Sequence, residues 1–257
     1  MKKNLLLSSL LLIYLSLPIN SAPMQGGVEK EFVLGGNSIV DSETNLPVPN
    51  AKISLPLEGF ATQSDAQGRF DLNATVKGPT VLSIEKEGYR PFSITIDKFD
   101  SSKPLVIAID KSTLKDITLD TQMFHLGDNS FSNNSANARE FQVKTIGPYY
   151  TKKFNLPSKV SEASLIIGSI IGLDTQIAKA MGQNKITTSY SSPAEVFFNG
   201  VKVSEIQING DGQKIKLPIA LVKKGKNEIT IKTGRNMFSD LVDYDDIEIV
   251  NLSIQTQ

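Results

Sequence analysis

Hydrophobic and polar residues alternate at every second position in many short stretches of this chain. Ile53 and Leu55, for example, flank Ser54, and residues 69–73 repeat the pattern. Side chains on a β-strand point to opposite faces in turn, so the alternation predicts strands with one buried face. Gly, Pro, Asp and Asn stand between the stretches, where they favour turns. The pattern predicts an all-β protein of stacked sheets.

The predicted strands fall into two groups, which we expect to form two β-sandwich domains. The first domain spans residues 31–110 and the second residues 117–257, with residues 111–116 as a linker. Strands are expected at 31–40, 51–55, 60–63, 69–73, 81–84, 92–96 and 105–109, and then at 117–124, 150–156, 163–171, 195–198, 214–217, 228–232 and 247–254.

Three further features interrupt the strands of the second domain. Residues 127–147 form a long polar stretch rich in Asn and Ser, and a loop of this length is usually functional. Asp174 to Gly182 predicts a short helix, with Asp174 as its N-cap. Asn199-Gly200 predicts a tight turn between two strands.

The first 22 residues have the layout of a secretory signal peptide. Lys2 and Lys3 precede a mostly apolar run from Leu5 to Leu17, and Ala22 follows at the expected cleavage point. The run is too short to span a bilayer comfortably, so we expect no membrane insertion after cleavage. The chain contains no Cys, which excludes disulfides and fits a bacterial protein that is secreted or periplasmic.

The charge balance narrows the classes of partner. Lys and Arg number 27, Asp and Glu also number 27, and the formal net charge is zero. Without a basic surplus, nucleic acid is excluded as an expected partner.

The first domain resembles the carboxypeptidase regulatory-like domain, a transthyretin-like seven-stranded sandwich. The residues that carry the resemblance are 47–53 (PVPNAKI), 65–70 (DAQGRF) and 86–89 (KEGY), together with 35–40. Domains of that family are accessory modules without catalytic residues. The resemblance therefore implies an appended domain and not an enzyme.

The second domain resembles galactose-binding-like jelly rolls, the fold of many carbohydrate-binding modules. Residues 194–200, 217–231 and 245–249 carry this resemblance. It implies that the first and last strands of the domain lie side by side, and that a structural Ca²⁺ is held at this edge.

An acidic cluster supplies the residues for such a cation. Asp240, Asp243, Asp245, Asp246 and Glu248 lie within nine positions, and Ca²⁺ prefers carboxylate and carbonyl oxygens. The alternative is an acidic loop that only faces water. The metal ligands that the resemblance implies are Asp128, Asn129, Asp245 and Asp246.

Aromatic side chains near the loops are the candidates for ligand binding, because aromatic faces stack on sugars or on partner side chains. The candidates are Phe131, Tyr149, Tyr150 and Tyr190. The alternative is that several of them simply cover the ends of the sandwich. His125 is the sole histidine, and its place at the end of an apolar strand favours a structural role over a catalytic one.

These observations favour an exported, non-catalytic binding protein that recognises a glycan or glycoprotein surface through loops of the second domain. The alternative is a structural or assembly protein of the cell envelope that uses exposed sheet edges. A hydrolase is the third hypothesis, although the chain has no Trp, which the clefts of sandwich hydrolases usually contain. Beyond Ca²⁺, no cofactor is expected.

Overall fold

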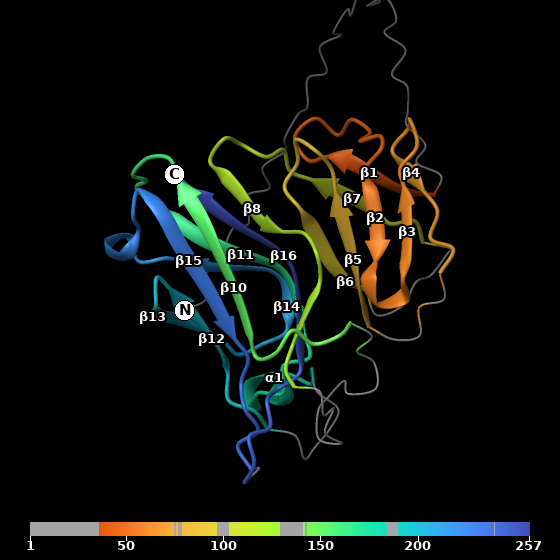
Figure 1. Ribbon diagram of the computed structural model, residues 1–257. Coiled ribbons are helices and arrows are strands. Elements are labelled where there is room, and N and C mark those ends of the chain that lie inside the picture. Colours follow the sequence, from red (N-terminus) through yellow and green to blue (C-terminus); the bar gives the residue numbers. More distant parts are fainter. Residues whose placement is uncertain are drawn as a thin grey trace, which may run out of the picture. The chain divides into compact units, whose positions relative to one another are not determined.

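The computed structural model describes residues 36–74, 76, 79–96, 103–128, 141, 143–183, 190–238 and 240–257. Almost all the regular structure in these residues is β, which confirms the predicted all-β fold of packed sheets (Figure 1). No helix among the described residues is long and apolar enough to cross a membrane. The predicted leader and the start of the first predicted strand lie outside the described residues.

The N-terminal sandwich consists of two sheets, shown from orange to olive in Figure 1. One sheet has the strand order β4-β1-β7 and the other the order β3-β2-β5-β6. β1 and β7 run parallel, whereas the other pairs are antiparallel. The strands are β1 (Asn37–Asp41), β2 (Lys52–Leu55), β3 (Phe60–Gln63), β4 (Arg69–Phe70), β5 (Thr80–Glu85), β6 (Phe92–Ile96) and β7 (Val106–Ile109), with a 3-10 turn at η1 (Pro56–Glu58).

The C-terminal sandwich also has two sheets. One follows the order β10-β15-β12-β13, and the other the order β14-β11-β16-β8, with β9 also paired to β16. The elements are β8 (Asp116–Asp120), β9 (Phe124–Leu126), β10 (Tyr149–Leu156), β11 (Ala163–Ile171), α1 (Gln176–Ala180), β12 (Ala194–Phe198), β13 (Val201–Ile206), β14 (Gly210–Lys216), η2 (Ile219–Leu221), β15 (Gly225–Lys232) and β16 (Ile247–Thr256).

The last strand lies beside the first strands of this sandwich, as the resemblance implies. β16 pairs antiparallel with β8 near its C-terminal end and with β9 near its N-terminal end. The sequence predicts one strand over residues 117–124, but the structure divides it between β8 and β9. This places His125, at the centre of β9, directly opposite Glu248 on β16.

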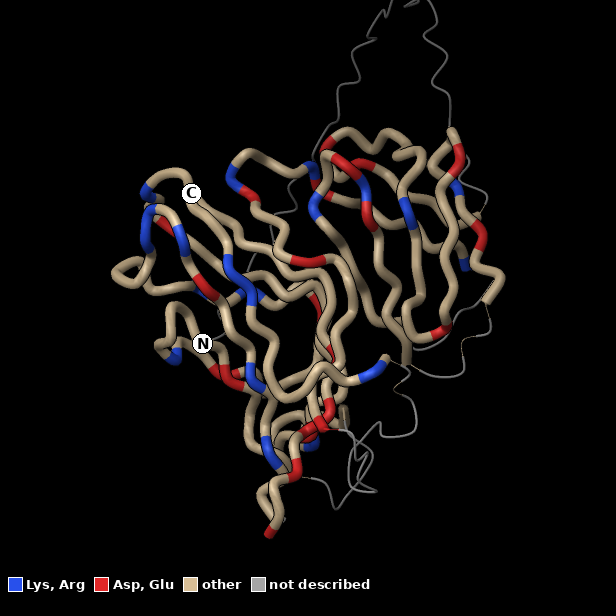
Figure 2. Tube along the Cα trace, viewed as in Figure 1, with Lys and Arg blue, Asp and Glu red and all other residues tan. Residues whose placement is uncertain are grey.

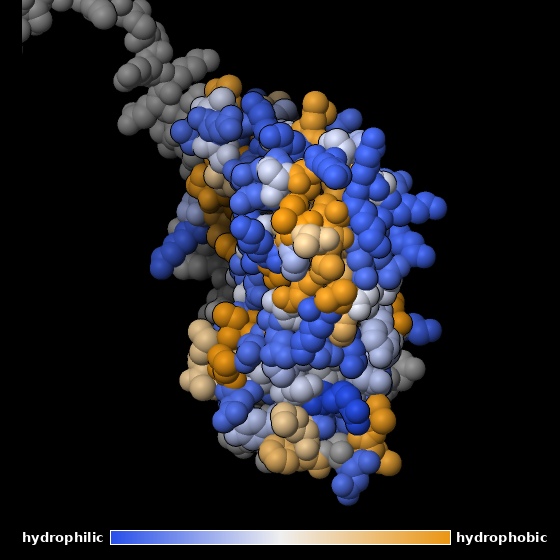
Figure 3. Space-filling view, turned by 90° about the vertical axis from the view of Figure 1, so that its left-hand side faces the viewer, coloured by the Kyte–Doolittle hydropathy of each residue, from blue (hydrophilic) through white to orange (hydrophobic). Residues whose placement is uncertain are grey.

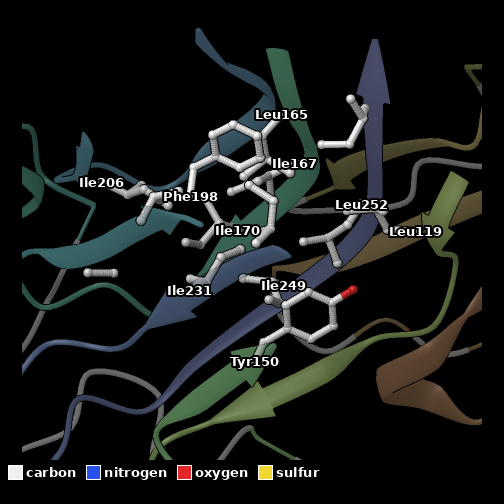
Figure 4. Close-up of a cluster of buried hydrophobic side chains, with 14 of the residues drawn as sticks. Leu119, Tyr150, Leu165, Ile167, Ile170, Phe198, Ile206, Ile231, Ile249 and Leu252 are labelled. Atoms are coloured by element: carbon white, nitrogen blue, oxygen red, sulfur yellow. The ribbon is translucent and has the colours of Figure 1, made fainter. Parts of the chain in front are cut away.

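Each sandwich encloses its own hydrophobic core. The inward positions of alternating strands supply it, so that Ile53 and Leu55 are fully buried in the first core. Phe198 is fully buried in the second core, whereas its neighbour Phe197 points to the other face. Figure 4 shows side chains from both sheets meeting in the second core. Fully burying one such side chain stabilises the fold by about 1.5–3 kcal/mol.

The predicted helix forms, but one residue later than its predicted cap. Thr175 is the N-cap of α1: its backbone is extended, and its hydroxyl accepts a hydrogen bond from the N–H of Ala178 at 3.1 Å. Asp174 is 1% exposed and its backbone N–H donates to Asp245, so it is not the cap. Gly182, at φ +73°, follows the helix as predicted. The turn residues Asn199 and Gly200 both have positive φ, as a tight hairpin turn requires.

Polar contacts join the two sandwiches, whose described residues belong to one compact unit. The side-chain amide of Asn251 donates to Ser83 Oγ at 2.9 Å and to the carbonyl of Phe92 at 2.8 Å. Gly168 allows this close approach, because a Cβ there would lie 2.5 Å from Ser93 Oγ. Asp211 of β14 accepts hydrogen bonds from both the N–H and the hydroxyl of Thr95.

Candidate functional site

Several chain segments meet at one end of the C-terminal sandwich, near α1 in Figure 1. Its described residues are 126–128, 141, 143–149, 171–183, 190–194, 206–210, 232–238 and 240–247, and we call this region the loop end. Hydrogen bonds join the segments to one another. The N–H of Tyr244 donates to Asp128 Oδ2 at 3.0 Å, that of Ser191 to the carbonyl of Asp174 at 3.0 Å, and that of Thr233 to the carbonyl of Pro148 at 3.0 Å.

A buried histidine–carboxyl pair lies at the base of the loop end. His125 is fully buried, and its Nε2 lies 3.0 Å from Asp246 Oδ1. Its Nδ1 lies 2.9 Å from the carbonyl oxygen of Val143, which can only accept, so Nδ1 carries a proton. One further proton is shared between Nε2 and the Asp246 carboxyl. Burial raises the pKa of Asp246, and the hydrogen bond from His125 offsets part of that rise.

Close backbone packing encloses this pair. Gly127 follows β9, and a Cβ at this position would lie 2.0 Å from Asp246 Oδ1. Gly172 follows β11, and a Cβ there would lie 2.6 Å from the ring of Phe141. That ring also packs against His125, with 4.6 Å between the ring centroids. Because glycine alone fits at these two points, the chain closes over the imidazole and excludes solvent from it.

Glu248 lies next to this pair. It is opposite His125 in the β9–β16 ladder and is 1% exposed. Among the described residues, no donor lies within hydrogen-bonding distance of either carboxyl oxygen. An ionised carboxylate without partners is very costly in a buried site, so the neutral acid is favoured. Burial raises the pKa of Glu248 to about 8, and the nearby backbone N–H of Val143 offsets only part of this rise.

A second pair of carboxyls, Asp174 and Asp245, is buried beside the first. Asp245 Oδ2 accepts a hydrogen bond from the N–H of Asp174 at 3.2 Å, whereas Asp245 Oδ1 has no partner among the described residues. Burial, and then the negative charge of Asp174, raise the pKa of Asp245 well above its usual range. The hydroxyl of Ser191 offsets part of this rise. Figure 2 shows acidic positions gathered at this end of the sandwich.

Above this buried layer, a hairpin projects apolar side chains into solvent. Its two arms are joined at Arg235 and Tyr244, and the N–H of Asn236 donates to the carbonyl of Asp243 at 2.8 Å. Figure 3 shows hydrophobic residues at the lower end of the molecule, where the loop end lies. The exposed residues at the hairpin tip are Met237 (69%), Phe238 (75%), Leu241 (79%) and Val242 (60%).

An aromatic pair connects this hairpin to the segment after α1. The rings of Tyr190 and Phe238 meet edge to face, with 5.5 Å between their centroids. The ammonium of Lys179 lies 3.6 Å from the centroid of the Tyr190 ring, which is a cation–π contact. Ile177 of α1 and Met181, the C-cap of α1, are also exposed, at 45% and 59%. The loop end therefore presents an apolar and aromatic rim over a buried layer of acids.

The structure separates the predicted ligand-binding residues. Tyr190 belongs to the apolar rim, and Tyr149 is 49% exposed at the start of β10. Tyr150 is 4% exposed and belongs to the second core (Figure 4). Its hydroxyl donates to Asp120 Oδ2 at 2.5 Å, and it offers no surface to a ligand. Phe131 lies outside the described residues.

The predicted metal ligands do not converge on one point. Asp246 faces His125, Asp245 faces Asp174, and Asp128 accepts a hydrogen bond from the backbone of Tyr244. Asn129 lies outside the described residues. Within the part of the chain that the structure describes, no group of three or more His, Cys, Asp or Glu side chains is arranged to hold a metal ion. The calcium site stays a prediction.

Sequence reasoning missed the hairpin tip as a surface feature. Met237-Phe238 and Leu241-Val242 are apolar pairs inside an otherwise acidic stretch, and that contrast was the available signal. The burial of Glu248 had no signal of its own, because an acid between Ile247 and Ile249 also fits a strand with one solvated face.

Comparison with known proteins adds no family assignment. No protein-family model matches the sequence, and no curated protein matches it. Among solved structures, an α-L-rhamnosidase from Streptomyces avermitilis, in complex with L-rhamnose, aligns with 86% of this chain at 11% identity and a TM-score of 0.24. This chain spans only 22% of that enzyme.

A protein from Bacteroides uniformis, provisionally assigned as carbohydrate-binding, aligns with 86% of this chain at 12% identity and a TM-score of 0.22. The alignment covers 97% of that protein. At TM-scores this low the similarities carry no argument about function. The proposals below rest on the geometry alone.

Proposed function

We propose that this chain is an exported, non-catalytic binding module that recognises a glycoprotein surface through the loop end. The observation that carries the proposal is the hairpin tip at residues 237–242, whose four described apolar side chains are 60–79% exposed. Water-exposed apolar clusters of this kind mark interaction sites, because burying them against a partner is favourable.

The aromatic pair supports a glycan as part of the ligand. Phe238 and Tyr149 present exposed ring surface, and Tyr190 holds Phe238 in an edge-to-face contact. Ring faces of this kind pack on the C–H faces of sugars. The neighbouring amide of Asn236 and carboxylate of Asp243 are 2.9 Å apart and supply planar polar groups beside the rings. A glycoprotein presents both an apolar protein surface and sugar, and these two match the apolar hairpin tip and the aromatic rings of the loop end.

The state of the histidine supports a non-catalytic role. A general base must reach the proton that it abstracts, directly or through one water molecule. His125 is fully buried, and both its ring nitrogens already face an acceptor. It is therefore placed as a structural group that orders the base of the loop end.

Assembly through sheet edges has less support. β13 is an edge strand, and Lys202 at this edge forms 2.7 Å ion pairs with both Glu195 and Glu205. Charged side chains, Lys above all, hinder the addition of a further strand to an edge.

The experiment is a binding screen of the purified chain on printed glycans and on glycoproteins, the latter with and without enzymatic deglycosylation. We expect Phe238→Ala to weaken binding by at least about tenfold, as expected for an exposed aromatic anchor. Val106→Ala is the matched control, because Val106 is 53% exposed on β7 of the other sandwich. Binding that survives in a Phe238→Ala, Leu241→Ala double variant would exclude the hairpin as the contact surface. Equal binding before and after deglycosylation would exclude the glycan.

A further inference from the structure

A cavity of about 510 Å³ opens at the junction of the two sandwiches, away from the loop end. Glu85, the last residue of β5, and residues 86–91 form one wall. Ser112, Thr118, Thr121 and Ser253 belong to the opposite wall. The volume is within the range of small-molecule sites, roughly 300–1,000 Å³.

Hydroxyl groups with free hydrogen-bonding capacity line the second wall. Thr118 of β8 and Ser253 of β16 are directly paired across the ladder, which places their side chains together. Thr121 and Ser112 continue the polar surface on either side. Among the described residues, none of these four hydroxyls has a hydrogen-bonding partner, although each can donate one hydrogen bond and accept others.

Acids balance the cationic groups around the cavity, because Lys86 and Arg90 line it together with Glu85, Glu87 and Asp116. Arg90 Nε lies 2.9 Å from Asp116 Oδ2, and Arg90 Nη1 lies 3.5 Å from Asp110 Oδ2. Glu85 is paired with Lys52 at 3.0 Å. A phosphate or carboxylate site needs cationic groups that are not already neutralised. This cavity therefore favours a neutral ligand, for which the remaining N–H groups of Arg90 are hydrogen-bond donors.

A fixed aromatic ring forms the apolar part of the first wall. The hydroxyl of Tyr89 donates to Asp41 Oδ2 at 3.0 Å, and its backbone bridges to Lys111. Gly88, at φ +84°, allows the turn that places Tyr89 here. Pro91 adds a second apolar surface. Because Tyr89 is held at both its backbone and its hydroxyl, the ring is positioned before any ligand arrives.

We propose that this junction cavity binds a neutral sugar unit, a monosaccharide or disaccharide. A sugar presents hydroxyls, which match the unpaired hydroxyls of Thr118, Thr121 and Ser253. It also presents a C–H face, which matches the ring of Tyr89. The site is separate from the loop end and does not depend on the function proposed for it.

The test is a titration of the full chain with glucose, galactose, mannose, maltose and lactose, followed by NMR of isotope-labelled threonine methyl groups. We expect the Thr118 and Thr121 signals to shift with at least one sugar, whereas Thr62 on β3, outside the cavity, stays unchanged. Glucose 6-phosphate is the anionic control and is expected to bind more weakly than glucose. No shift at either threonine at sugar concentrations up to about 10 mM overturns the proposal.

Isosteric variants then assign the contacts. Thr118→Val and Ser253→Ala each remove one hydroxyl and keep the shape, and we expect affinity to fall about fivefold for each, the effect of one neutral hydrogen bond. Thr62→Val and Phe238→Ala should bind the sugar as the unaltered chain does. Loss of sugar binding in Phe238→Ala alone would instead place the sugar at the loop end. Since the methyl shifts use the unaltered protein, a variant that fails to fold does not remove the test.

Discussion

Asp41 in the first sandwich and Glu248 in the second are equally buried, at 2% and 1% exposed, but their pKa values shift in opposite directions. The pKa of Asp41 lies well below its usual range, whereas that of Glu248 is raised to about 8. Burial alone therefore does not determine the protonation state of an acid in this protein. Hydrogen bonds are the main cause of the low pKa of Asp41, whereas burial is the main cause of the raised pKa of Glu248.

Asp41 is the last residue of β1, and several hydrogen-bond donors contact its carboxylate. The hydroxyl and the backbone N–H of Thr44 both donate to Oδ1 at 2.8 Å, and these two bonds are the main cause of the low pKa. Tyr89 donates to Oδ2, and the ammonium of Lys111 lies 3.3 Å from the same oxygen. Every one of these contacts favours the ionised form.

Glu248 is surrounded by apolar strand neighbours and by a histidine whose nitrogens are already used. The two sandwiches therefore treat buried acids differently. The first uses one as an ionised anchor for a turn and for Tyr89, which forms a wall of the junction cavity. The second buries acids beneath the loop end that are neutral or share a proton with His125. Keeping these acids protonated in the folded state lowers the free energy of unfolding at high pH.

The largest expected effect comes from breaking the His125–Asp246 pair. His125→Leu leaves the Asp246 carboxyl buried without its partner, which should lower the free energy of unfolding at pH 7 by about 3–5 kcal/mol. Urea unfolding followed by circular dichroism measures the change. The matched control is a His125→Leu, Asp246→Leu double variant, which removes both groups and should recover much of the loss. A single variant as stable as the unaltered chain would show that the pair is not buried as described.

An effect of opposite sign, which develops only as pH rises, is expected at Glu248. Its ordinary pKa is 4.5 and its folded pKa is about 8, so between these values the unfolded chain releases a proton that the folded chain keeps. The stability of the unaltered protein therefore falls as pH rises from 4.5 to 8. Glu248→Gln removes this loss, and its stability relative to the unaltered chain should rise by roughly 5 kcal/mol between pH 4 and pH 9.

Thermal and urea unfolding at several pH values test this prediction. Glu228→Gln on β15 is the control, because its side chain is 37% exposed and pairs with exposed Lys153. A Glu248→Gln variant that is destabilised equally at every pH would indicate that the carboxyl has a partner in the folded state.

The smallest effect concerns the loss of folding stability at low pH. The folded pKa of Asp41 lies below its ordinary value of 3.8, so its contribution is complete above pH 3.8 and is lost as pH falls further. Asp41→Asn should lower Tm at pH 7 and make Tm less sensitive to pH below 4. Asp71→Asn, on an exposed residue after β4, is the comparison variant. Parallel Tm–pH curves for Asp41→Asn and the unaltered chain would contradict the assignment.

The amino-acid sequence located the strands at 60–63, 92–96 and 163–171 with their observed bounds. It did not predict β13, although Val201 and Val203 alternate with polar residues there. It also placed the Asn199-Gly200 turn, because the need for positive φ is a local property. It assigned the helix cap to Asp174 instead of Thr175, since both residue types can cap and only the contact with Asp245 separates them.

The candidate sites were less predictable. Tyr149 and Tyr150 are neighbours in the sequence, but strand alternation exposes the first and buries the second, and the strand's register determines which. The junction cavity joins residues 85–91 to Ser253, more than 160 positions later. Periodicity within a short segment contains no information about such a pairing.

The sequence by itself determined an all-β fold, because the choice of strand and of turn depends on neighbouring residues and on the two-residue repeat of side-chain direction. Only the tertiary structure decided which acids are ionised and which surfaces are open. Those properties depend on partners that are distant along the chain, as His125 is from Asp246, and on the exclusion of water that their packing produces.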